Sequence, residues 1–207
     1  MTLLIGALTV GLILSLLALG VYISFRIFNV ADMTADGSIA LGGATAAILL
    51  VKGVHPLLAT TAGAAMGMVA GTVTGVLHAR LRIHGLLAGI LTQIGLWSVN
   101  LRIMGSSNVP LLREDTIFTP LRDAGLMGSW ASVGIFAAVV AVITAAIVWF
   151  LNTDFGLAVR ATGDNGPMIR SFGVSTDRTK LITLALSNGL VGAPGAVFAQ
   201  YQGFADN

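Results

Sequence analysis

The sequence consists of long apolar runs separated by short polar segments. Six of these runs approach the length of about 20 residues that crosses a bilayer as an α-helix. They cover Leu3–Phe25, Ile39–Val51, Leu57–Leu77, Leu86–Met104, Trp130–Leu151 and Leu181–Ala199. The second run is short unless it begins at Gly37. The pattern predicts an all-α fold, a polytopic bundle of about six transmembrane helices that forms a single domain over residues 1–207.

Composition supports a lipid environment. The 207 residues are 56% hydrophobic and 10% charged, whereas soluble domains carry about a quarter of charged residues. The net charge of +2 comes from few ionisable groups, and no basic helix or aromatic-interleaved patch accompanies it, so we expect no nucleic-acid partner. Cysteine is absent, and the three histidines have no acidic or cysteine companion at ligand spacing, so we expect no metal site.

The basic residues predict an orientation, because cytoplasmic loops retain an excess of Lys and Arg. With the N-terminus outside, seven basic residues lie in cytoplasmic segments and four outside. The cytoplasmic group is Arg26, Arg80, Arg82, Arg160, Arg170, Arg178 and Lys180, and the outer group is Lys52, Arg102, Arg113 and Arg122. This bias predicts that the loop Gly105–Ser129 is outside and that the loop Thr153–Lys180 is cytoplasmic.

Glycine recurs at every fourth position of the third run. The members of this stripe are Gly63, Gly67, Gly71 and Gly75. In lipid, a stripe of small residues lets another helix backbone approach closely, so we expect this helix to be buried in the bundle or in a dimer interface, or to serve as a conformational pivot. Pro194, between Ala193 and Gly195 in the sixth run, predicts a kink or a discontinuous helix.

No enzyme motif is present, and we expect no catalytic residue. A P-loop needs G-x-x-x-x-G-K-[ST], but Lys52 and Lys180 are followed by Gly53 and Leu181, so the chain has no ATP site of that kind. Asp32 and Asp36 are more economically explained as a polar segment at the start of a helix than as a general acid and base. Asp36 or Ser38 can cap that helix, the second one.

The predicted cytoplasmic loop Thr153–Lys180 contains the pattern of a short amphipathic helix. Asp164 is placed as its N-cap, Pro167 lies in its first turn, and Gly173 ends it. Three apolar side chains fall on one face, namely Met168, Ile169 and Phe172. Such a helix either rests on the membrane surface and neighbouring loops or serves as a docking helix for a soluble partner.

Two long blocks carry a resemblance to a known family. The first is FGLAVRATGDNGPMIRSFGVSTDRTKLITLALSNGLVGAPGAVFAQYQGFAD, which resembles the cytoplasmic coupling region of ATP-binding-cassette (ABC) importer permeases of the ribose and branched-chain amino acid type. The N-terminal half, with FRIFNVADMTADGSIALGGATAA and LLAGILTQIGLWSVNLRIMGSSNVPLL, is similar to permeases linked to uptake of tryptophan, tyrosine or related solutes. Such permeases usually continue through further membrane helices after the GFAD segment, which implies that this sequence, ending at Asn207, lacks them.

The resemblance implies an importer in the inner membrane of a bacterial cell. Its membrane channel would be homodimeric or pseudo-symmetric, an ABC ATPase subunit would bind ATP and Mg²⁺ on the cytoplasmic side, and a solute-binding protein would deliver cargo from outside. The permease itself would hold no cofactor. The loop helix would sit in a cleft of the ATPase, and Arg170 would pair with a partner carboxylate or remain solvated. The residues assigned to ATPase coupling in this way are Asp164, Asn165, Met168, Ile169, Arg170 and Phe172.

Polar residues within or beside the spans are candidates for the solute pathway, because such groups are costly in lipid. They are Asp36, Ser38, Gln93, Asn100 and Asn188. Each could instead satisfy a neighbouring helix. An amino acid cargo is suggested only by the resemblance. Two other classes remain, a stand-alone ion-coupled carrier or channel and a membrane scaffold subunit. A carrier would hold ionisable residues deep in its helices, whereas here nearly all charges lie at the predicted helix ends.

Overall fold

The computed structural model describes residues 2–207, excluding the side chain of Thr2, and within them the chain is almost entirely helical. The helices are α1 (Thr2–Tyr22), the π-helical turn η1 (Ile23–Ile27), α2 (Thr34–Val51), α3 (Pro56–Ala79), α4 (Gly85–Met104), α5 (Thr119–Asp123), α6 (Trp130–Leu151), α7 (Asp154–Ser171) and α8 (Thr176–Gln202). Among the described helices, six are long and apolar enough to cross a membrane, with η1 extending the first. The six-span bundle expected from the apolar runs is therefore confirmed.

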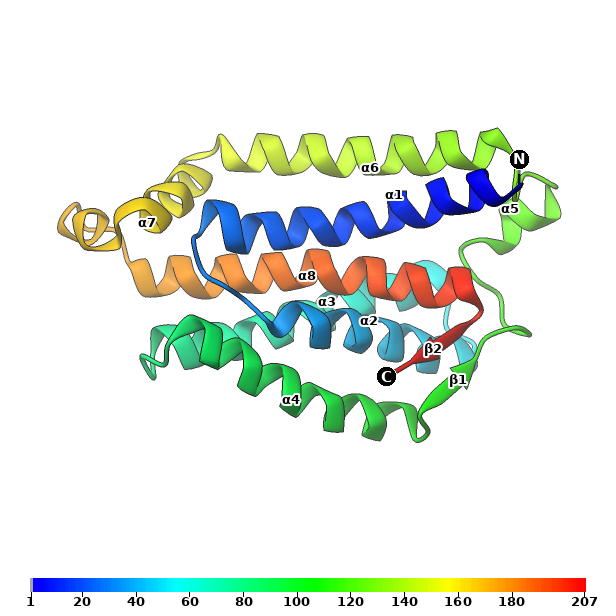
Figure 1. The fold of residues 1–207 in the computed structure, drawn as a ribbon, viewed down its shortest axis with the longest axis horizontal. Helices are drawn as coiled ribbons and strands as arrows, with labels where there is room; N and C mark the ends of the chain where they lie inside the picture. Colours follow the sequence, from blue (N-terminus) through cyan, green and yellow to red (C-terminus); the bar gives the residue numbers. More distant parts are fainter. Residues whose placement is uncertain (1) are drawn as a thin grey trace.

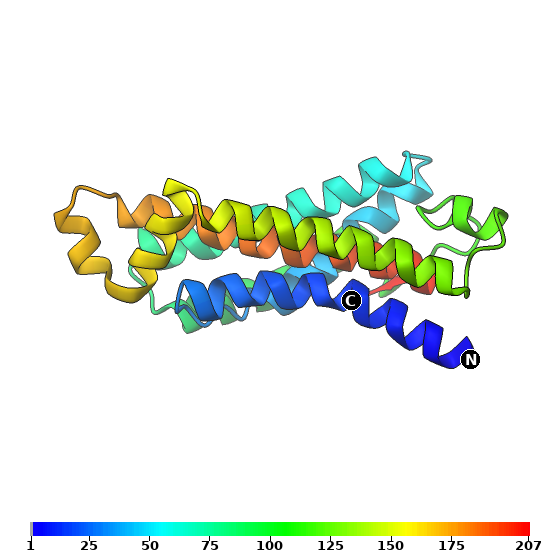
Figure 2. The same ribbon diagram turned by 90° about the horizontal axis from the view of Figure 1, so that it is seen from above.

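The spans lie side by side along the long axis of the molecule, with α8 at the centre (Figure 1). Helix α8 packs against α1, α2 and α3, while α4 packs on α2 and α6 packs on α1. Figure 2 shows the same elongated bundle from above. Helix α6 lies at the edge and exposes most of its side chains, burying only Ser132 and Leu151. Its apolar surface suits contact with lipid or with another protein.

Glycines allow the three central helices, α2, α3 and α8, to approach backbone to backbone. A Cβ added to Gly67 or Gly71 would collide with the carbonyl oxygens of Asn188 or Leu184 on α8. At Gly75 it would lie 3.0 Å from the Cα of Leu181. The structure thus places the α3 stripe against α8 of the same chain. The matching glycines on α2 and α8 were not predicted. They are Gly42, Gly43, Gly189, Gly192 and Gly195.

Two helix boundaries differ from the expectation. Helix α2 begins at Thr34 rather than near Gly37 or Ile39, because the small and polar side chains of its first turns are buried against neighbouring helices. Neither Asp36 nor Ser38 caps it. Instead, Asp32 Oδ1 accepts a hydrogen bond from the Thr34 N–H at 2.9 Å.

Helix α8 runs without a break from Thr176 to Gln202, so of the two expectations at Pro194, a kink or a discontinuous helix, the discontinuous helix is wrong. Proline removes one backbone hydrogen bond, but close packing against neighbouring helices can hold a membrane helix together at such a position. Here Gly192 and Gly195, on either side of Pro194, lie against the backbones of α3 and α2. Pro194 itself is buried.

A small sheet closes one end of the bundle. Strand β1 (Asn108–Pro110) pairs antiparallel with β2 (Phe204–Asp206), with Val109 opposite Ala205. Beside it, Phe118 is buried against Phe136 and Tyr201, with ring centroids 5.6 Å apart in each pair. The sequence pattern predicted neither this sheet nor the short helix α5. Both lie in or beside the loop that was expected to be outside.

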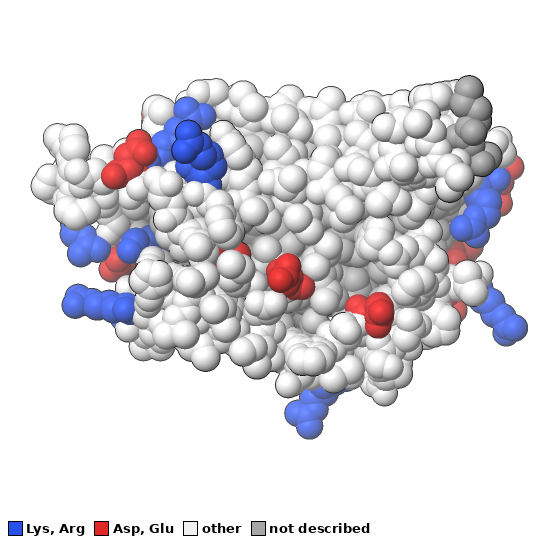
Figure 3. All heavy atoms as spheres, in the orientation of Figure 1, with Lys and Arg blue, Asp and Glu red and all other residues white. Residues whose placement is uncertain are grey.

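Charged side chains are distributed as in a membrane protein. On the face drawn in Figure 3, most basic side chains gather at the two ends of the long axis. The middle is mostly uncharged, interrupted by a few acidic side chains and by one basic side chain at the lower edge. Acidic groups at this level need an explanation, because carboxylates do not face lipid without a large cost.

Candidate functional site

A buried polar cluster lies at the centre of the bundle. Asn188, near the middle of α8, donates from Nδ2 to Asp32 Oδ2 at 2.6 Å and accepts at Oδ1 from the Ser38 hydroxyl at 2.7 Å. All three residues are buried. The cluster joins α8 to the start of α2 and to the segment that leads into it. Helix α2 therefore begins at mid-depth, well inside the bundle, as Figure 1 also shows.

A chain of threonine hydroxyls extends the cluster to α3 and α4. The Thr34 and Thr74 hydroxyl oxygens are 2.6 Å apart, and those of Thr74 and Thr92 are 2.9 Å apart. These residues are also buried. Hydroxyls that bond to one another or to a carbonyl of their own helix keep polar atoms satisfied without water. The whole arrangement fixes the start of α2 between α3, α4 and α8.

Next to this core, α2 and α4 form an open groove of about 360 Å³. Asp36 lies in the first turn of α2, and its Oδ2 accepts a hydrogen bond from Gln93 Nε2 at 3.3 Å. Trp97 and Asn100 continue the α4 wall, since residues 93, 97 and 100 share one helix face. Asp36 and Trp97 are exposed, whereas Asn100 is buried. Gly37 allows α4 to approach α2 closely, because a Cβ added at position 37 would lie 2.8 Å from Leu96 Cδ1.

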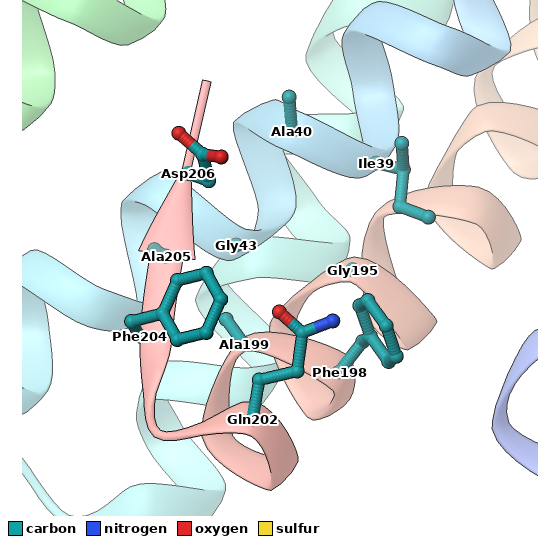
Figure 4. A pocket seen from close by; sticks show the side chains of 10 residues that line it. All are labelled: Ile39, Ala40, Gly43, Gly195, Phe198, Ala199, Gln202, Phe204, Ala205 and Asp206. Carbon is teal, nitrogen blue, oxygen red and sulfur yellow. The ribbon is translucent and has the colours of Figure 1, made fainter. Parts of the chain in front are cut away.

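A second, mainly apolar pocket of about 200 Å³ adjoins this groove at Ala40. It lies between α2, the end of α8 and β2. Figure 4 shows Gln202 between Phe198 and Phe204, facing Ile39 and Ala40 across the pocket. Asp206 lies at its edge. Groove and pocket share Ala40 and both lie along α2, and together they are called the concave face of α2.

At the other end of the bundle, α7 consists of two helical pieces joined at Asn165. Asn165 has non-helical backbone angles (φ −152°, ψ 84°), and its Oδ1 accepts a hydrogen bond from the Met168 N–H at 3.1 Å. Asp164 was predicted as this N-cap, and that assignment is wrong. Asn165 is the residue with extended φ, so its side-chain oxygen reaches the free N–H groups of the next turn.

The second piece of α7 presents apolar side chains outward. Met168 is 53% exposed and Phe172 is 71% exposed, while Ile169 is partly buried. Within the chain, the Arg170 guanidinium contacts Asp177 Oδ1 at 3.1 Å and Thr176 Oγ1 at 2.6 Å. These contacts hold the end of α7 against the start of α8.

The first piece of α7 contacts the segment that leads to the polar cluster. Asn29 Nδ2 donates to the Gly163 carbonyl at 3.2 Å, and a Cβ on Gly163 would collide with the Ile27 carbonyl oxygen. Asn29 and Asp32 belong to the same short connection between η1 and α2. A displacement of α7 would therefore act directly on the residues that hold the start of α2.

The structure brings the five pathway candidates together around α2. Ser38 and Asn188 belong to the buried cluster, and Asp36, Gln93 and Asn100 line the groove. Sequence reasoning missed the role of Asp32, which was treated only as part of a helix start, and did not single out Thr34, Thr74 and Thr92. An acidic residue shortly before the apolar run Ile39–Val51 was the available signal at Asp32. Over residues 2–207, no group of three or more His, Cys or acidic residues could hold a metal ion.

The structure has six apolar helices, a buried polar cluster at mid-depth and a groove beside that cluster. These features define a multi-pass membrane protein of the permease class. Residues 3–207 match the family described as branched-chain amino acid transport system / permease component. The chain belongs to this family, which confirms the resemblance noted in the sequence.

Named relatives belong to several transport systems. The chain is 39% identical over 202 residues to a tyrosine transport system permease protein of Clostridioides difficile, covering 98% of this chain and 66% of that protein. It is 29% identical over 199 residues to the autoinducer 2 import system permease protein LsrC of Yersinia pseudotuberculosis, covering 94% of this chain and 54% of LsrC. A probable branched-chain amino acid permease, LivH of Methanocaldococcus jannaschii, is 27% identical over 210 residues, covering 93% and 64%. No solved structure matches the chain significantly.

Proposed function

We propose that this chain is the transmembrane permease subunit of an ABC importer and forms the pathway for a small solute. The observation that carries the proposal is the end of α7, where Met168 and Phe172 stay exposed on a capped helix turn. Exposed apolar anchors of this kind are typical of a docking surface for another protein. Family membership indicates that the docked protein is the ATPase of a transport system.

ATP binding and cargo delivery are assigned to other proteins of the importer. Neither lysine lies in a P-loop motif, so ATP and Mg²⁺ are assigned to the partner ATPase. A solute-binding protein delivers cargo at the end that holds β1, β2 and α5. The cargo is a small solute, and the relative named for tyrosine transport supports an amino acid.

The pathway runs along the concave face of α2. Asp36 is exposed. It lies at mid-depth, because its hydrogen-bond partner Gln93 is near the middle of α4. A carboxylate at this depth faces a watery cavity or another protein rather than lipid. We therefore place a second copy of the permease opposite this face, so that the solute passes between the two copies.

An ion-coupled carrier remains the second candidate, because one observation favours it. Nearly all charges were expected at the helix ends, but the structure corrects this for Asp32 and Asp36, which lie at mid-depth. Ionisable groups at this level are typical of ion-coupled transport. Family membership outweighs these two carboxylates and favours the importer.

Co-purification with transport assays separates the two functions. The complete permease is expressed with its candidate ATPase and purified through a tag on the permease. The importer proposal requires that the ATPase co-purifies and that proteoliposomes take up solute only with ATP and the binding protein. Uptake driven by an ion gradient in the permease alone would reject the importer and establish the carrier.

A further inference from the structure

The groove between α2 and α4 holds one carboxylate, that of Asp36, among the side-chain amides of Gln93, Asn100 and Asn207. Asp36 has two carboxylate oxygens, of which Oδ2 accepts from Gln93. Asn100 is 1% exposed, and its Oδ1 has no hydrogen-bond partner among the described residues. A buried acceptor without a donor destabilises the folded chain. Of the three amides, Gln93 donates to Asp36 and Asn207 donates to the Trp97 carbonyl, so Asn100 Oδ1 is the amide oxygen left buried without a donor.

The groove also lacks a positive charge. The one ion pair found in residues 2–207 joins Arg170 to Asp177, far from Asp36 along the bundle. The nearest basic residue on α4 is Arg102, nine positions after Gln93, which is about half a turn away around the helix. Arg102 thus points away from the groove. A carboxylate at mid-depth with no basic partner creates a local negative potential.

Trp97 adds an aromatic surface to the same wall. It is exposed, one helical turn beyond Gln93, and lines the groove together with Ile94. The face of an indole ring also attracts cations, through the quadrupole of its electron-rich face rather than through a net charge. Carboxylate, free amide oxygen and indole together suit one chemical group, a protonated amine with several N–H donors.

On these observations we propose that the groove lined by Asp36, Gln93, Trp97 and Asn100 binds the ammonium group of the transported solute. This inference rests on the proposed function, because it assigns the pathway a substrate class. Asp36 provides the counter-charge, Asn100 Oδ1 accepts an N–H, and Trp97 covers the cation. Neutral polyols and anionic solutes lack the charge that this groove selects.

The absence of cysteine allows a test that needs neither the ATPase nor the binding protein. Ile94→Cys places one thiol on the groove wall, and Ser107→Cys places one in the exposed loop before β1 as the reference. Methanethiosulfonates that carry trimethylammonium or sulfonate are then compared on the purified full chain. The ratio of cationic to anionic labelling rates in Ile94→Cys should exceed that in Ser107→Cys by roughly tenfold.

Substitutions assign this preference to Asp36. Asp36→Asn in the Ile94→Cys chain should reduce the ratio to the reference value, whereas Asp36→Glu should retain it. Asp123→Asn on α5, outside the groove, is the matched control and should change nothing. An equal ratio with and without Asp36→Asn would overturn the proposal.

Protection experiments test the ligand directly. 2-Phenylethylamine should slow labelling of Ile94→Cys, while its uncharged analogue 2-phenylethanol should not. Asn100→Ala should weaken this protection several-fold without changing the ratio for the charged reagents, because it removes an acceptor and no charge. Equal protection by the amine and the alcohol would reject ammonium recognition. A permease that fails here but still co-purifies with its ATPase remains an importer with another substrate class.

Discussion

Asn188 holds together three segments that are far apart in the sequence. Its amide bonds Asp32 on one side and Ser38 on the other, and it donates to the Leu184 carbonyl of its own helix. In a low-dielectric interior such a network stabilises the fold only when every member is satisfied. Loss of the amide would leave Oδ2 of the buried Asp32 carboxylate without its donor.

We therefore predict that Asn188→Ala lowers the free energy of unfolding by roughly 3 kcal/mol. Unfolding is followed by titration with SDS in mixed micelles. Asn152→Ala is the matched control, because Asn152 is exposed and donates only to its own helix at Val148. It should change the free energy by no more than about 0.5 kcal/mol. Equal effects of the two substitutions would show that the central cluster contributes little.

A single methyl group tests the contact between α3 and α8. Gly71→Ala places a Cβ against the Leu184 carbonyl, which is backbone and cannot rotate away. We expect a loss of about 1–3 kcal/mol in unfolding free energy, as for other overpacked sites. Gly134→Ala on α6 is the control, because no atom lies within 4 Å of its added Cβ. It should be neutral or stabilise by up to about 1 kcal/mol. A stable Gly71→Ala would mean that the two helices separate easily.

At the scale of elements, the two pieces of α7 have different surroundings. One side contacts the connection before α2, while Met168 and Phe172 on the other piece remain exposed. If the ATPase covers these two side chains, their truncation removes its apolar anchor. A buried anchor contributes about 2 kcal/mol or more, which weakens docking at least tenfold.

We predict that the double substitution Met168→Ala and Phe172→Ala leaves the permease folded but abolishes co-purification of the ATPase and ATP-driven uptake. Leu112→Ala is the control, since Leu112 is equally apolar and exposed but lies at the opposite end of the bundle. Arg170→Ala should have a smaller effect, because an exposed ion pair contributes at most about 1 kcal/mol. Undiminished ATPase binding in the double variant would make α7 an element of the membrane surface only.

Apolar runs identified the spans but not all of their ends. The core of each helix could be predicted because about 20 apolar residues in succession have few alternatives to crossing the membrane. The start of α2 could not, because Thr34 and Ser38 are polar by composition and are buried only through Thr74 and Asn188. Likewise, the sequence around Pro194 alone predicts a break in the helix. The unbroken α8 is explained by its packing against α2 and α3, which the sequence does not show.

The same limit applies to the candidate site. Depth along a helix could be predicted for Gln93 and Asn188, which fell within expected spans, but not for Asp36, which was expected at the start of one. Their partners could not be predicted, because Ser38 and Asn188 are 150 residues apart and no spacing rule connects them. The role of Asp32 depends on one such pairing. Local helix patterns carry information over one or two turns, whereas this cluster exists only in the assembled bundle.

For the whole molecule, the basic residues that were assigned to opposite sides of the membrane lie at opposite ends of the bundle. Arg80 and Arg82, between α3 and α4, share one end with α7, and Arg113 and Arg122 lie at the other end near the small sheet. The end with more Lys and Arg is expected to face the cytoplasm. This orientation places α7 where an ATPase can reach it and places β1, β2 and α5 outside.

The final prediction tests this orientation in intact cells. Asn108→Cys at β1 and Ser171→Cys at the end of α7 are both at exposed positions in a chain without cysteine. A membrane-impermeant maleimide should label Asn108→Cys from outside, but should label Ser171→Cys only after the membrane is opened. Val142→Cys, exposed in the middle of α6, should react from neither side, because a thiol in lipid does not ionise to the reactive thiolate. If Ser171→Cys is the variant labelled in intact cells, the orientation is reversed. In that case α7 lies outside and cannot dock an ATPase.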